Sequence, residues 1–117
     1  MNELGLYFPN VNKLKLSEGG EMAIYASFLK MTAAGNKEIK KSRHRFEQGK
    51  KGVEKLGGKI LDAYYIVSRG EYLIISEFPD HDARVKSMVQ TLQQGNVSYE
   101  VFRMLPIEEY FKLVDSV

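Results

Sequence analysis

The chain has 117 residues, of which 44% are hydrophobic and 27% charged, and its formal net charge at pH 7 is +2. This length suits one domain, and so small a net charge does not by itself indicate a nucleic-acid partner. The sequence contains no cysteine, which excludes disulfides, thiolate nucleophiles, iron–sulfur clusters and cysteine-based zinc sites. Because no apolar stretch reaches the roughly 18–20 residues that cross a bilayer, and no secretory signal is evident, we expect a cytoplasmic protein.

The first 21 residues differ from the rest of the chain. They contain Pro9 and end near the pair Gly19-Gly20, both of which interrupt regular structure. We predict an N-terminal appendage over residues 1–21 and a folded domain over residues 22–117. The alternation of Leu4, Leu6 and Phe8 leaves a short edge strand open as an alternative.

Four segments have the pattern of β-strands. Residues 22–31 are apolar on both faces, which is typical of a central strand. Residues 59–67 and 72–78 are joined by a short link, which indicates an antiparallel hairpin. In the first of these two strands, alternation places Ile60, Tyr64 and Ile66 on one face. The fourth strand covers residues 97–104.

Helical periodicity lies between and after these strands. A turn over residues 32–35 precedes the first helix, which stops at Gly57-Gly58, and Asp80 caps the second. Pro106 suits the first position of a short third helix. The expected buried stripes are Ile39, Phe46, Val53 and Leu56; then Val85, Met88, Val89 and Leu92; then Ile107, Tyr110, Phe111 and Val114.

The element order is therefore β-α-β-β-α-β with a short C-terminal helix. This order predicts an α+β fold of the ferredoxin-like kind, with a four-stranded antiparallel sheet and both long helices on one face. The strands have apolar residues at both odd and even positions, so apolar side chains lie on both faces of the sheet. The face without helices would therefore expose a large apolar surface. A second copy is the simplest cover, and we predict a homodimer that pairs through its sheets.

Several stretches resemble the GYD family, named for a Gly-Tyr-Asp motif. The hairpin residues Gly70-Glu71-Tyr72, and the strand end Glu77-Phe78-Pro79-Asp80, are similar to that motif region, with Glu71 inserted and Leu73 where the Asp would follow. The resemblance covers residues 22–114. It implies a dimeric α+β barrel and supplies no catalytic residues.

Tyrosines on the strands are the first candidates for a ligand site. Tyr25, Tyr65 and Tyr72 lie on three different strands, where they can line a pocket that holds a small ring-shaped ligand. Ordinary aromatic packing in the core is the alternative for all of them.

Three charged or titratable residues complete the candidates. Glu77 lies on an apolar strand, so it either pairs with Arg69 or Arg103 or acts as a base. Arg69 is also a candidate for ligand binding. His44 lies between Arg43 and Arg45, which favour its neutral form and make it available as a base. An ordinary surface histidine is the alternative.

Known chemical motifs are absent from the sequence. It contains no P-loop, no dinucleotide fingerprint and no metal-ligand spacing, so we expect no cofactor and no metal. A small-molecule-binding or sensing module is the leading interpretation, and a cofactor-independent enzyme acting on a small organic molecule is the alternative. Residues 37–59 hold nine Lys or Arg against three Glu, which leaves nucleic-acid binding through the first helix as a third hypothesis. The third strand lacks the aromatic residues of an RNA-binding sheet.

Overall fold

A four-stranded antiparallel sheet forms the framework of the molecule. The computed structural model describes residues 22–117, and the predicted appendage lies outside the described residues. The strands are arranged in the order β2-β3-β1-β4. They are β1 (Ala23–Met31), β2 (Lys59–Ile66), β3 (Glu71–Phe78) and β4 (Val97–Met104). The predicted ferredoxin-like α+β order is confirmed.

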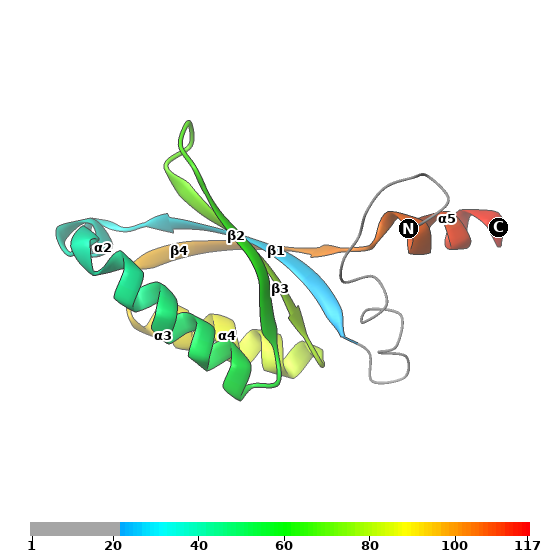
Figure 1. Ribbon diagram of the computed structural model, residues 1–117, viewed down its shortest axis with the longest axis horizontal. Helices are drawn as coiled ribbons and strands as arrows, with labels where there is room; N and C mark the ends of the chain where they lie inside the picture. Colours follow the sequence, from blue (N-terminus) through cyan, green and yellow to red (C-terminus); the bar gives the residue numbers. More distant parts are fainter. Residues whose placement is uncertain (1–21) are drawn as a thin grey trace.

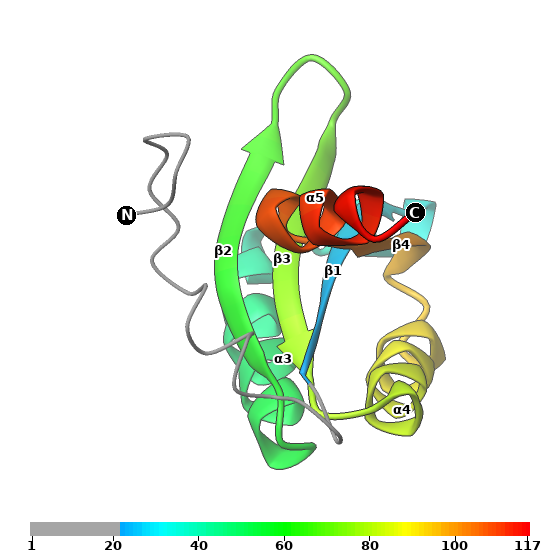
Figure 2. The same ribbon diagram turned by 90° about the vertical axis from the view of Figure 1, so that its right-hand side faces the viewer.

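Two long helices cover one face of the sheet. They are α3 (Ser42–Lys55) and α4 (His81–Gln93), which lie on the same side of the strands (Figure 1). α3 packs against β2, whereas α4 packs against β3 and β4 (Figure 2). Asp80 caps α4 as predicted, because its Oδ1 atom accepts a hydrogen bond from the Ala83 amide at 2.7 Å. We call the sheet surface turned away from these helices the open face.

The segment before α3 differs from the prediction. Residues 32–35 do not form a simple turn, since Thr32 caps a short helix, α2 (Ala33–Lys37), and its Oγ1 accepts from the Gly35 amide at 3.1 Å. At Glu38 the backbone leaves helical geometry, with φ −115° and ψ 35°, and a 3₁₀ turn follows over Ile39–Lys41. This break changes the helical phase. Ile39, predicted to lie on the buried stripe, is therefore 53% exposed.

The predicted assignment of side chains to the two faces of β2 is wrong because this strand contains a β-bulge. The register shifts between Ile60 and Asp62, so that Ile60 pairs with Ser76 but Asp62 already pairs with Ile75. The extra residue reverses the alternation beyond this point. Ile60 therefore shares its face with Ala63 and Tyr65, and not with Tyr64 and Ile66 as the plain alternation predicts.

The core lies where both helices meet the sheet. Tyr25, Val53, Phe78 and Ala83 form its buried cluster, with the Tyr25 and Phe78 ring centroids 6.1 Å apart. Gly57, at φ +84°, ends α3 beside this cluster in the left-handed conformation that glycine adopts without steric cost. The predicted glycine stop is confirmed.

The last helix stands apart from the rest of the fold. α5 (Ile107–Asp115) begins after Pro106 as predicted and extends beyond the end of the sheet (Figure 1). None of its residues is buried, and Tyr110 and Leu113 are 50% and 58% exposed. Within residues 22–117, no helix is long and apolar enough to cross a membrane.

Candidate functional site: a cleft between sheet and helices

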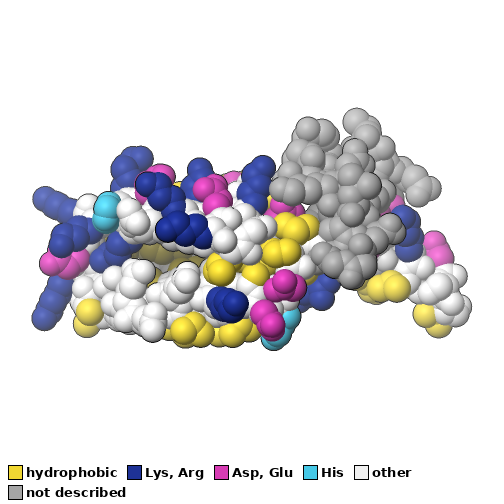
Figure 3. All heavy atoms as spheres, turned by 90° about the horizontal axis from the view of Figure 1, so that it is seen from below, with side chains coloured by type: hydrophobic (Ala, Val, Ile, Leu, Met, Phe, Trp, Pro, Cys, Tyr) yellow, Lys and Arg dark blue, Asp and Glu magenta, His cyan; other side chains and the backbone are white. Residues whose placement is uncertain are grey.

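A cleft opens between α3, α4 and the sheet. Seen from the helical side, the surface is hollowed between the two helices, with hydrophobic side chains at its floor and Lys and Arg gathered along α3 (Figure 3). The cavity volume is about 140 Å³. An engineered cavity of about 150 Å³ in another protein holds benzene, so this cleft has room for a group of one ring.

The inner side of α4 creates much of this space. Ala83 and Ser87 are its buried residues, and Thr91 continues the same side one turn further on. Val89 and Leu92, predicted to face the core, are instead 46% and 43% exposed. The helix therefore turns small and polar side chains toward the sheet, and these leave the volume between them unfilled.

Gly49 contributes from the opposite wall. It lies in the middle of α3 and lines the cleft, and a Cβ atom built on it would meet nothing within 4 Å. The missing side chain leaves a space at this position and does not serve a tight contact between α3 and the sheet.

The lining combines an apolar surface with several polar groups. The apolar part comes from all four strands and from α3: Leu29, Met31, Phe46, Val53, Ile60, Ile74 and Val97. The polar part lies around it: Ser42, Arg45, Tyr72, Ser87, Thr91, Gln94, Asn96 and Tyr99. A concave, mainly apolar site with a few polar groups is the usual form of a small-molecule site.

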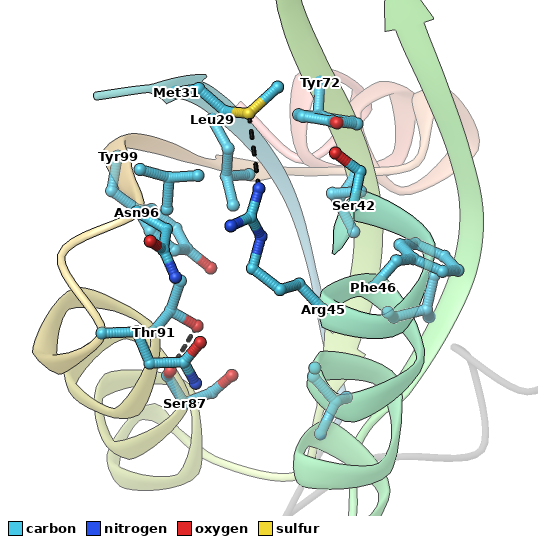
Figure 4. A pocket seen from close by; sticks show the side chains of 16 residues that line it. Leu29, Met31, Ser42, Arg45, Phe46, Tyr72, Ser87, Thr91, Asn96 and Tyr99 are labelled. Carbon is cyan, nitrogen blue, oxygen red and sulfur yellow. Dashed lines mark hydrogen bonds between the residues drawn. The ribbon is translucent and has the colours of Figure 1, made fainter. Parts of the chain in front are cut away.

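Arg45 reaches into the middle of the cleft. Its side chain extends from α3 toward Met31 on β1, with Asn96 on the far wall (Figure 4). The Nη2 group donates to the Gly35 carbonyl oxygen at 3.1 Å and contacts the Met31 sulfur at 3.6 Å. Both partners are neutral. The contact to Gly35 links the guanidinium to α2 and so restricts its position.

Tyr99 supplies a hydroxyl group on the β4 side. Burial raises the pKa of Tyr99 above its ordinary value, although a hydrogen bond with Ser27 and the charge of Arg84 act in the opposite direction. A tyrosine phenol is protonated at neutral pH, and the upward direction of this shift strengthens that preference. In that form it can donate a hydrogen bond to a ligand but cannot serve as a base.

The predicted tyrosines lie in three different environments. Tyr72 lines the cleft. Tyr65 lies outside the lining, although its ring contacts that of Tyr72 with the centroids 5.2 Å apart. Tyr25 belongs to the core cluster, where the Arg84 guanidinium lies 5.3 Å from its ring centroid. The structure thus places Tyr65 and Tyr72 together and leaves Tyr25 in the core.

The other predicted residues lie away from the cleft. Glu77 is fully buried and pairs in register with Ile24 and Lys59, which places it on the open face. Arg69 lies in the hairpin between β2 and β3 and forms an ion pair with Glu71. His44 is exposed on α3. None of these three lines the cleft, so the structure does not bring them together with Tyr72.

Three residues of the cleft were not predicted from the sequence as binding residues: Arg45, Asn96 and Tyr99. Arg45 directly precedes Phe46 and so lies off the apolar stripe of the predicted helix. A usable signal was present: Arg45 follows Ser42 by three positions and precedes Gly49 by four, so the three share one side of a helix. No such sequence signal is present for Asn96. This residue is positioned by a hydrogen bond that the Thr32 amide donates to its backbone carbonyl oxygen at 3.0 Å.

No metal centre is evident in this part of the molecule. Across the described range 22–117, no three His, Asp or Glu side chains gather in a way that could hold a metal ion. The arrangement is one that can bind an organic molecule through apolar contact and hydrogen bonds.

The fold and the cleft define the class of protein. It is a ferredoxin-like α+β domain with a cleft of about 140 Å³ between its sheet and its helices. The model of the GYD domain family matches residues 25–114, which is most of the chain. The chain therefore belongs to the GYD domain family. No curated protein and no solved structure matches it significantly.

Proposed function

We propose that this GYD-domain protein is a small-molecule-binding or sensing module of the cytoplasm that acts as a homodimer. The observation that carries the binding role is the cleft itself, which combines an apolar floor with Arg45, Tyr72 and Tyr99 at its walls. Its volume of about 140 Å³ fits a ligand of one ring or a short branched chain.

The chemistry of the lining favours binding over catalysis. Among the described residues that line the cleft, there is no carboxylate and no imidazole, which are the usual general bases. The Tyr99 phenol is protonated at neutral pH like any tyrosine, and burial moves its pKa further from neutrality. The alternative, a cofactor-independent enzyme, would need its base from elsewhere, so turnover of a bound compound would support that alternative.

Thermal-shift measurements with a set of single-ring organic compounds test the binding role. Wild-type protein is compared with Gly49→Leu, which places a side chain into open space inside the cleft, and with Gln48→Leu, which changes the neighbouring exposed position. We expect at least one compound to raise the melting temperature of wild type and of Gln48→Leu but not of Gly49→Leu. If no compound raises it, or if Gly49→Leu responds equally, the cleft is not the binding site.

The open face supports the homodimer. Tyr64 and Phe102 remain 57% and 49% exposed there, and Phe28 packs edge-on against Phe102 with ring centroids 5.9 Å apart. Neighbouring positions in the register add further apolar side chains: Ile24, Leu73, Ile75 and Met104. A stable interface needs about 800 Å² from each partner, and a four-stranded sheet can offer a surface of this size.

Sedimentation of the full chain tests the homodimer. We expect wild type to sediment as a dimer, and Phe102→Lys to sediment as a monomer because a charge would be buried in the interface. Val89→Lys is the matched control, since Val89 is a similarly exposed apolar residue on the helical side. A monomeric wild type at tens of micromolar concentration would contradict the proposal.

A further inference from the structure

The charge distribution in the cleft points to the class of ligand. Of the described residues that line the cleft, Arg45 alone carries a charge. It forms no ion pair with any Asp or Glu of residues 22–117, whereas Lys41 and Arg69 each have an acidic partner. The cleft therefore presents one positive charge that no described carboxylate neutralises.

The hydrogen bonds of Arg45 leave much of its guanidinium available. Only Nη2 has acceptors, the Gly35 carbonyl and the Met31 sulfur. The Nε and Nη1 donors have no acceptor within the part of the chain that the structure describes. A guanidinium presents five N–H donors in a planar fork that matches the two oxygens of a carboxylate.

The surroundings make an anion favourable at this position. Arg45 is half-buried, and Leu29 and Met31 of β1 lie beside its side chain (Figure 4). A cation that is partly removed from water interacts more strongly with an anion than an exposed cation does. The α2 contact already restricts the side chain, so little conformational entropy remains to be lost when a ligand binds.

We infer that the cleft binds a small organic monocarboxylate. This inference rests on the proposed binding function. The carboxylate group bonds to the Arg45 guanidinium, and an apolar body of about one ring packs on Leu29, Phe46 and Ile74. The neutral hydroxyl and amide groups of Tyr99 and Asn96 lie on the opposite wall, where they can add hydrogen bonds.

A phosphate ester fits this site less well than a carboxylate. It would bring close to two negative charges, and the described lining offers one cation to meet them. The lysines of α3 lie on the exposed side of the helix and outside the lining. The second charge would be left among apolar side chains, which is costly.

Benzoate and benzyl alcohol are the probes for this inference. They have nearly the same shape, but only benzoate is an anion at pH 7. In a titration of the full chain followed by amide chemical shifts, we expect benzoate to bind wild type at least 10-fold more tightly than benzyl alcohol. The shifted resonances should belong to residues around the cleft, including Asn96 and Tyr99.

Substitution of Arg45 provides the second part of the test. Arg45→Met keeps much of the side-chain length and removes the charge, and it should lower the affinity for benzoate by about 10- to 100-fold, so that benzoate loses its advantage over benzyl alcohol. Arg45→Lys should retain part of the preference for the anion. Arg43→Met, an exposed arginine of the same helix, is the matched control and should bind both probes as wild type does.

The outcomes separate the inference from the proposed function. Equal affinity for the two probes, or an unchanged benzoate affinity in Arg45→Met, would overturn the carboxylate assignment and leave a binding cleft for neutral ligands. If neither probe binds wild type, the binding function and the inference fail together. The wild-type comparison does not depend on how well any variant folds.

Discussion

Gly35 and Asn96 approach each other so closely that a Cβ atom on Gly35 would lie 2.1 Å from the Asn96 carbonyl oxygen. The same oxygen accepts the Thr32 amide at 3.0 Å, and the Thr32 hydroxyl donates to the Gly95 carbonyl at 2.6 Å. These contacts join the beginning of α2 to the end of α4. They hold together the two segments that carry the acceptor for Arg45 and the cleft residue Asn96.

Gly35→Ala should therefore destabilise the protein. The added methyl group meets backbone and not a flexible side chain, so the chain must move, at a cost of about 1–3 kcal/mol in the free energy of unfolding. Gly52→Ala is the control, because its Cβ would lie 3.5 Å from the nearest atom, Gln90 Oε1. Urea denaturation should show a loss for Gly35→Ala and a small gain for Gly52→Ala. Equal stability of the two variants would mean that the contact is not tight in solution.

Gly49→Ala should stabilise the protein. Alanine in the interior of a helix is favoured over glycine by about 0.8–1.0 kcal/mol, and the position has open space for the methyl group. Thermal and urea unfolding measure the gain. A loss of stability would indicate that the cleft closes around Gly49 in solution.

Removal of the α4 cap should cost about 1 kcal/mol. In Asp80→Ala the Ala83 amide loses its acceptor at the start of the helix. Asp82→Ala removes the same charge two residues further on, within the first turn of α4, where no side-chain capping bond is made. The difference between the two unfolding free energies isolates the hydrogen bond, and no difference would show that Asp80 acts through its charge alone.

The alkaline stability of the fold should depend on Tyr99. Burial raises its pKa above the ordinary value of 10.0, so above that pH the folded chain keeps a proton that the unfolded chain releases. Stability contributed by this group is complete below pH 10.0 and is lost as the pH rises through the folded-state pKa. Unfolding at pH 8 and at pH 11 should show a smaller alkaline loss in Tyr99→Phe than in wild type. The exposed Tyr110→Phe serves as the control, and parallel losses in all three proteins would contradict the assignment.

The strands and main helices follow from the sequence because their local signals agree with the tertiary structure. The stop at Gly57 and the cap at Asp80 are fixed by their immediate neighbours, and both predictions are confirmed. The prediction of which face of a strand or helix a residue lies on fails where contacts between distant parts of the chain determine the local geometry. The bulge after Ile60 reverses a face without any change in composition, and the break at Glu38 rotates Ile39 into solvent.

The cleft was harder to foresee for a related physical reason. Hydrophobicity selects Val89 and Leu92 as the inner residues of α4, although Ala83 and Ser87 lie on the inner side. A space between elements depends on which residues are small, and small residues carry almost no hydrophobic signal. Tyr72 was predicted as a ligand-binding residue because tyrosines on neighbouring strands can line a pocket. Arg45 was not, because most of its neighbours in the sequence are polar or charged residues of the kind that face solvent.

The irregularity in β2 also limits how sheets of different molecules can join. β2 is one of the two edge strands, and its bulge between Ile60 and Asp62 interrupts the row of backbone donors and acceptors at that edge. A strand from another molecule cannot pair along such an edge in continuous register. Growth into an extended, fibre-like sheet is thereby hindered on this side.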